Sequence, residues 1–112
     1  MANLVYKHGQ RKHLFAVRQL LPDPNAEDSY VAGPLVAVYS STNPTEVIRQ
    51  ARRLVSPPYT VVHVTGYMLA LAHQGQQGFR LWVIEPDGYV GEQYMVSLVD
   101  MVRAGWSIRK TP

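Results

Sequence analysis

Residues 13–21 fit a β-strand, in which the two-residue period places Phe15, Val17 and Gln19 on one face and Leu14, Ala16 and Arg18 on the other. The apolar residues before Gly9 predict another strand, which turns at Gly9 into this one. The stretch PDPNAEDS follows as a loop rich in turn-forming residues. The next run, GPLVAVYSS at residues 33–41, is apolar on both faces, which predicts a strand in the centre of a sheet.

The residues after this run predict a helix over Pro44–Val55. Asn43 is a suitable N-cap, Pro44 is well tolerated at the first helical position, and Glu46 completes a capping box. Apolar residues at helical spacing predict one buried stripe, made of Val47, Ile48, Ala51, Leu54 and Val55. The sequence SPP then ends the helix, because proline cannot continue its hydrogen-bond ladder.

The most apolar segment of the chain, YTVVHVTGYMLALAHQG, follows this helix. Its β-branched residues predict a strand over Tyr59–Thr65. The remainder, Tyr67–His73, fits either a continued strand or a short helical turn. We favour the strand, with a bend or bulge at Gly66, because a glycine inside a strand often marks such a position.

The last third of the chain predicts a hairpin, a helix and a strand. Residues 79–96 fit a β-hairpin with the sequence PDG in its turn. A second helix is predicted over Leu98–Ala104, with Ser97 as its N-cap and Gly105 as the left-handed residue after its end. The sequence WSIRK then predicts a final strand.

Together these elements predict a single α+β domain over residues 1–112. We expect a mostly antiparallel sheet of about five to seven strands with two helices packed on one face. The order strand, strand, helix, strand occurs twice, in residues 13–65 and 67–110. The chain is therefore also compatible with two degenerate β-β-α-β units, although the two halves share little similarity at the residue level.

Composition excludes several classes of protein. The chain has 112 residues and no cysteine, which excludes disulfides, thiol catalysis and thiolate metal sites. Its first residues do not form a signal peptide, and no apolar segment is long enough to cross a bilayer. We therefore expect a soluble, cytoplasmic protein.

Charged residues are scarce and unevenly distributed. They make up 17% of the chain, and none occurs between Leu54 and Phe79. An uncharged strand at an open sheet edge invites pairing with another sheet. This stretch is therefore expected either to lie centrally in its own sheet or to pair with a second copy of the chain, and we favour a homodimer.

The formal net charge is +3, and several basic residues are grouped. Three arginines project away from the apolar stripe of the first predicted helix: Arg49, Arg52 and Arg53. They fit a solvated helix face, partly neutralised by Glu46, or a surface that binds phosphate or carboxylate groups through the guanidinium fork. Three basic residues near the N-terminus would extend such a surface if they lie on the same side: Lys7, Arg11 and Lys12.

Aromatic and histidine side chains offer further candidates for binding. Trp82 and Tyr89 are candidates for stacking on nucleotide bases, although we favour a core position for Trp82. The histidines have no i, i+4 pair and no carboxylate partner in a known metal-binding pattern, so we predict no metal site. His63 is better interpreted as a hydrogen-bonded, half-buried residue of the sheet.

No catalytic pattern is present in the sequence. It has no nucleophile elbow and no phosphate-binding glycine loop with a lysine, and the acidic loop lacks the glycine and final glutamate of a calcium site. We therefore expect no enzymatic activity and no cofactor.

The sequence favours a small, non-catalytic binding or regulatory module that recognises a protein partner as a homodimer. The contact would be apolar and aromatic, with arginines at its rim. One alternative is a nucleic-acid-binding protein that uses the basic helix face and the basic N-terminus. A second alternative is a small-ligand site between the sheet and the helices, lined by tyrosine and histidine residues.

Overall fold

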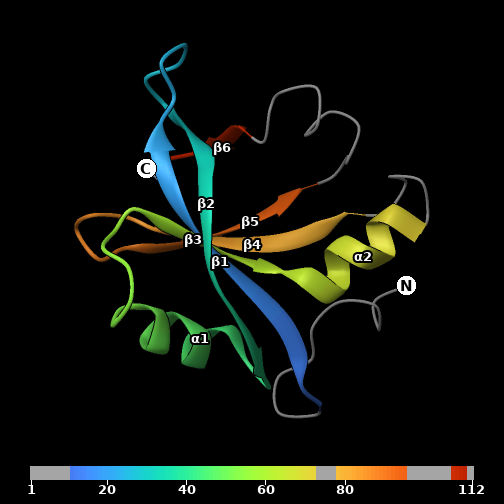
Figure 1. Ribbon diagram of the computed structural model, residues 1–112. Coiled ribbons are helices and arrows are strands. Elements are labelled where there is room, and N and C mark those ends of the chain that lie inside the picture. The colour runs from blue at the N-terminus through green and yellow to red at the C-terminus, as the bar shows by residue number, and fades with distance from the viewer. Residues whose placement is uncertain (1–10, 73–77, 96–106, 111–112) are drawn as a thin grey trace.

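The computed structural model describes residues 11–72, 78–95 and 107–110. Their helices and strands follow one another in the order β1 (His13–Pro22), β2 (Ser29–Ser41), α1 (Pro44–Ala51), β3 (Tyr59–His63), α2 (Val64–Ala72), β4 (Phe79–Ile84), β5 (Val90–Met95) and β6 (Ser107–Arg109). Figure 1 shows the strands as a curled, half-barrel-like sheet with two short helices beside it. The predicted α+β class is confirmed, with β-structure predominant.

The strand β3 occupies the middle of the sheet. The strand order is β5-β4-β3-β1-β2-β6, and every neighbouring pair is antiparallel. β3 pairs with β1 on one side and β4 on the other, and all 5 of its residues are buried. A charged side chain here would lose its hydration without a partner. The expectation that the uncharged stretch lies centrally is thus confirmed for β3, and this stretch no longer gives a reason for a homodimer.

One face of the sheet packs against α1. The Tyr59 hydroxyl donates a hydrogen bond to the Ile48 carbonyl at 3.1 Å and so joins the helix to β3. The rings of Phe15 and Trp82 lie 6.1 Å apart in this layer. The buried cluster on this face consists of Phe15, Val17, Val47, Ile48, Ala51, Val55, Tyr59, Val61, Trp82 and Ile84.

A second core lies on the opposite face, formed by the alternate side chains of the same strands. Tyr67 of α2 packs edge-on against Phe79, with ring centroids 5.3 Å apart. The Tyr30 hydroxyl donates a hydrogen bond to Oε1 of the buried Glu85 at 2.5 Å, which joins β2 to the end of β4. Burial and this carboxylate raise the pKa of Tyr30 to about 12. The buried cluster on this face consists of Leu20, Tyr30, Val62, Phe79, Leu81, Val83 and Ile108.

The start of α1 is as predicted, but its end is not. The Asn43 side chain accepts a hydrogen bond from the Glu46 amide at 2.9 Å, and Pro44 begins the helix. The helix ends at Ala51 rather than at Val55, and a turn follows. Val55 is still buried, whereas Leu54 points outward and is 61% exposed. Leu54 is therefore not part of the buried stripe, because the residues after Ala51 no longer follow the helical period.

The prediction of a strand over Tyr67–His73 is wrong, because residues Val64–Ala72 form α2. Gly66 lies inside the first turns of this helix and does not mark a bulge. A Cβ atom on Gly66 would come within 2.9 Å of His63 Nδ1 and 3.2 Å of Phe79 Cβ. The glycine is thus required by close side-chain packing, a reason that the local sequence does not reveal.

Two further predictions involve residues that the structure does not describe. The expected second helix, Leu98–Ala104, lies outside the described residues, so its place on the same face as α1 stays a prediction. The two helices that are described pack on opposite faces of the sheet, since α1 contacts the Phe15 cluster and α2 the Phe79 cluster. The second of the two suggested β-β-α-β units includes the helix expected over Leu98–Ala104, so the duplication stays a prediction. The helix α2 is an additional element that the repeated pattern did not contain.

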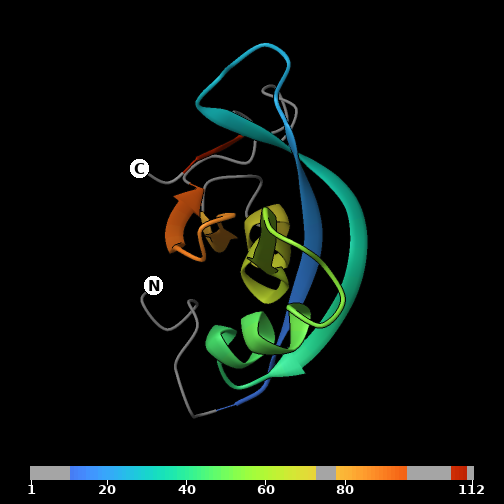
Figure 2. The ribbon, with the colours of Figure 1, turned by 90° about the vertical axis from the view of Figure 1, so that its left-hand side faces the viewer.

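The sequence predicts a central position for residues 33–41, but the described strands flank this part of β2 on one side only. β2 pairs with β1 from Tyr30 to Ser41, but with β6 only over Ser29–Val31. Its outer edge from Ala32 to Ser41 has no strand partner among the described residues. Figure 2 shows β1 and β2 as a long bowed pair, with β2 on the outside. A strand whose side chains are apolar on both faces can therefore lie in the centre of a sheet or have one exposed edge, and the sequence did not distinguish the two positions.

The predicted hairpin is confirmed. β4 pairs with β5 along its whole length, with Phe79 opposite Met95 at one end and Ile84 opposite Val90 at the other. Gly88 in the turn has a φ of 92°, which glycine adopts without steric cost.

We expect the substitution Asn43→Ala to lower the free energy of unfolding by about 1 kcal/mol, because it removes the acceptor for the Glu46 amide at the helix start. Urea denaturation measures this change. Asn43→Ser, which keeps a capping oxygen, should lose much less. Equal losses in both variants would contradict a capping role.

Candidate functional site

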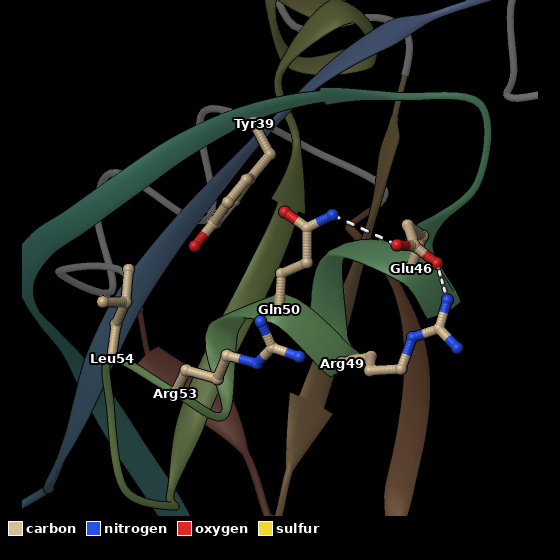
Figure 3. Close-up of a pocket in the computed structure, with 6 residues that line it drawn as sticks. All are labelled: Tyr39, Glu46, Arg49, Gln50, Arg53 and Leu54. Carbon is tan, nitrogen blue, oxygen red and sulfur yellow. Dashed lines mark hydrogen bonds and ion pairs between the residues drawn. The ribbon is translucent and has the colours of Figure 1, made fainter.

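A hollow of about 450 Å³ lies between α1 and β2 (Figure 3). Tyr39 enters it from β2 and faces side chains of α1, and the exposed Leu54 lies just beyond the end of the helix. We call this hollow the α1–β2 groove; it is lined by Tyr39, Glu46, Arg49, Gln50, Arg53 and Leu54. It combines an apolar end with a polar one.

The charges in the α1–β2 groove are unequally paired. Glu46 forms an ion pair with Arg49 and accepts a hydrogen bond from Gln50 Nε2 at 3.1 Å. Arg53 forms no ion pair with any described residue. Arg53 is therefore the side chain of this groove that is best placed to bind an added carboxylate or phosphate group.

The three arginines predicted as one basic surface are divided by the helix. Arg49 borders both the α1–β2 groove and a second hollow of about 390 Å³, which Arg52 also lines together with Val90 at the start of β5. Of these two hollows, Arg53 lines only the first. Helical spacing predicted that all three arginines point outward, but Arg52 and Arg53 project towards different neighbouring strands, Arg53 towards β2 and Arg52 towards β5.

Of the remaining predicted binding residues, none that the structure describes lines either of these two hollows. Lys7 lies outside the described residues, and Arg11 and Lys12 are exposed just before β1. Trp82 is only 7% exposed and belongs to the core, as we favoured. Tyr89 is exposed in the turn between β4 and β5, next to Val90.

A pair of histidines from distant parts of the sequence forms a second polar feature. His13 Nδ1 and His63 Nε2 lie 2.7 Å apart in a hydrogen bond, and the two rings are stacked with centroids 4.9 Å apart. Antiparallel pairing of β1 with β3 places His63 opposite Phe15, and hence close to His13. No spacing rule could find this pair, because it depends on which strands are neighbours.

The histidine pair is held in its neutral form. Burial lowers the pKa of His63 to about 4, helped by the positive charge that His13 would carry and by Arg80. Burial and the nearby Arg11 also lower the pKa of His13. At neutral pH one ring therefore donates the shared hydrogen bond and the other accepts it. The expectation of a hydrogen-bonded sheet residue is confirmed for His63, which is buried more completely than predicted.

The buried polar groups do not converge on one reaction centre. Glu85 and Tyr30 lie near the Tyr59 end of β3, because Glu85 follows the partner of Tyr59 in β4, whereas His63 is at the other end. At about 3.3 Å per residue, the ends of β3 are roughly 13 Å apart. Within residues 11–72, 78–95 and 107–110, no three histidine, aspartate or glutamate side chains are placed to hold a metal ion.

Compared with protein-family models, curated proteins and solved structures, the chain shows no significant match. No helix in the described part of the chain has the length and apolar character needed to span a bilayer. A function must therefore be proposed from the chemistry of the chain's own surfaces.

We expect the free energy of unfolding to fall as the pH is lowered from about 6.5 towards 4. In this range the unfolded chain binds a proton at His63 and the folded chain does not, so acid favours unfolding. The lowering of the His63 pKa from 6.5 to about 4 corresponds to about 3 kcal/mol in the free energy of unfolding. This contribution is fully present above pH 6.5. Urea denaturation at a series of pH values measures it.

The variant His63→Gln is the control for this experiment, because glutamine can still bond His13 but does not titrate. Its stability should depend less on pH over the same range, while the carboxylates contribute equally to both proteins. An identical pH dependence in both proteins would show that His63 is not responsible.

Proposed function

We propose that the protein is a small, non-catalytic binding module that recognises a segment of another protein in the α1–β2 groove. The observation that supports this most is the placement of Tyr39 and the 61% exposed Leu54 beside the guanidinium of Arg53 in one open hollow. Apolar and aromatic contacts with arginine beside them are common in protein-binding surfaces.

The chemistry of the groove favours a segment that carries one apolar and one acidic side chain. Full burial of a large apolar side chain contributes about 1.5–3 kcal/mol, so covering Leu54 and Tyr39 is the larger source of affinity. An ion pair with Arg53 at this exposed position contributes only about 0.2–1 kcal/mol. The apolar contact therefore supplies most of the affinity, and Arg53 fixes the orientation of the bound segment.

The two alternative functions have less support. A nucleic-acid strand needs several cations along its path, but Arg49 is paired with Glu46 and Arg52 borders a different hollow. Trp82 is in the core and offers no stacking surface. Small-molecule sites enclose most of their ligand, whereas side chains that line the α1–β2 groove, such as Leu54 and Arg49, are themselves largely exposed to solvent.

We expect selection from a random peptide library against the full chain to enrich peptides with an acidic residue close to an aromatic or aliphatic one. Leu54→Asp should weaken their binding at least about tenfold, because it removes the apolar contact and repels the acidic residue. Arg53→Ala should weaken it about two- to fivefold, as suits an exposed ion pair. Fluorescence anisotropy of labelled peptides measures both effects.

Tyr89→Ser is the matched control, because Tyr89 is 54% exposed but lies outside the α1–β2 groove. It should leave peptide binding unchanged. The proposal is wrong if Leu54→Asp has no more effect than Tyr89→Ser. Tight binding of single-stranded oligonucleotides, with a salt dependence that decreases in the double variant Arg49→Ala, Arg53→Ala, would favour the nucleic-acid alternative instead.

A further inference from the structure

The outer edge of β2 differs from the two strands that end the sheet. β5 carries Glu92, which pairs with Arg80 at 3.5 Å, and β6 has only 3 residues, one of them Arg109. Short length and charged side chains are the usual means by which proteins keep an exposed edge from pairing. Both terminal strands of the described sheet are protected in this way.

Among the residues that the structure describes, nothing gives the outer edge of β2 from Ala32 to Ser41 either form of protection. The strand is 13 residues long, and the sequence from Ser29 to Thr45 contains no charged residue. Its apolar side chains are also exposed, since Leu35 and Val38 are 58% and 54% accessible to solvent. Such an edge presents unpaired backbone donors and acceptors together with apolar surface, which suits pairing with another strand.

Exposed apolar side chains continue beside this edge on the face that carries α2. Val38 pairs with Ala16 and Leu35 with Arg18, so both side chains lie on this face. Leu35 and Met68 of α2 also line a shallow hollow of about 320 Å³. The edge and the apolar face thus form one continuous surface, on which a partner strand could gain both hydrogen bonds and apolar contacts.

We propose that a second copy of this chain occupies the surface, with the two β2 strands paired antiparallel about a two-fold axis at Val38. An exposed strand edge pairs with another extended strand, and β2 itself brings no charged side chain to such a pair. The self-pairing places no like charges opposite each other, although each copy carries a net charge of +3. The pairing uses the backbone edge of β2 and its α2 face, whereas the side chain of Tyr39 lines the α1–β2 groove on the other face, so the inference does not depend on the proposed function.

The length of the open edge determines the position of the axis. Pro34 has no N–H group to donate and bounds the usable edge on one side, and Ser41 is the last residue of β2 on the other. Residues 35–41 remain between them, with Val38 midway. At about 3.3 Å per residue they extend over roughly 20 Å, which is enough for a stable strand pair with an apolar face.

This dimer would also bring the two α1–β2 grooves together. Tyr39 follows Val38 and points to the opposite face, into the groove. A two-fold axis at Val38 therefore places the grooves of both copies side by side on the α1 face of a continuous sheet. Two linked sites of this kind bind a divalent partner more tightly than either alone.

A single introduced cysteine tests the axis directly, because the chain has none of its own. Residues opposite each other in an antiparallel pair have Cα atoms about 4.5–5.5 Å apart, within the range for a disulfide. Val38→Cys should form a disulfide-linked dimer on mild oxidation of the full chain, seen by non-reducing electrophoresis. Tyr94→Cys, similarly exposed at 49% but on β5, should oxidise to dimer at least tenfold more slowly.

Sedimentation analysis of variants without cysteine completes the test. The unmodified chain and Tyr94→Lys should sediment as dimers, and Val38→Lys as a folded monomer with an unchanged circular dichroism spectrum. The inference is overturned if the unmodified chain is monomeric at every concentration, or if both cysteine variants oxidise at the same rate. Neither result affects the groove peptide assay, and loss of peptide binding in Leu54→Asp leaves the dimer test unchanged.

Discussion

The burial of β3 on both faces is the constraint on which the rest of the structure depends. Every residue from Tyr59 to His63 is removed from solvent, with side chains directed alternately to the two faces. A strand in this position needs a partner on each edge and cover on each face. The pairing with β1 and β4, and the placement of α1 and α2 on opposite faces, follow from that need.

His63 shows how this constraint acts on a polar side chain. An imidazolium without a counter-charge in the interior would be costly, so the ring remains neutral and its nitrogen must find a hydrogen-bond partner. His13 supplies that partner across the β1–β3 pair, and Gly66 leaves room for the ring on the other side. Three residues that look unrelated in the sequence thus belong to one packing arrangement.

The features that could be predicted from the sequence are those with local causes. The cap at Asn43 and the turn at Gly88 depend on a few consecutive residues, and both are found as expected. The helix at Val64–Ala72 was missed because Gly66 and its β-branched neighbours disfavour helix locally, while packing against His63 and Phe79 requires the glycine. Helical spacing likewise predicted that the arginines of α1 are exposed. It could not predict that they line two different hollows, because this depends on where β2 and β5 lie beside the helix.

The scarcity of charge has two different physical causes in two parts of the chain. Around β3 it follows from burial, because a charge there would lose its water on every side. Along β2 burial is not the cause, since Leu35 and Val38 remain more than half exposed. From composition alone the two segments are equivalent, and the uncharged stretch around β3 is compatible with either a central position or a dimer. The strand order distinguishes them: β3 has a strand partner on both sides, whereas β2 is the strand for which we propose a partner from a second copy.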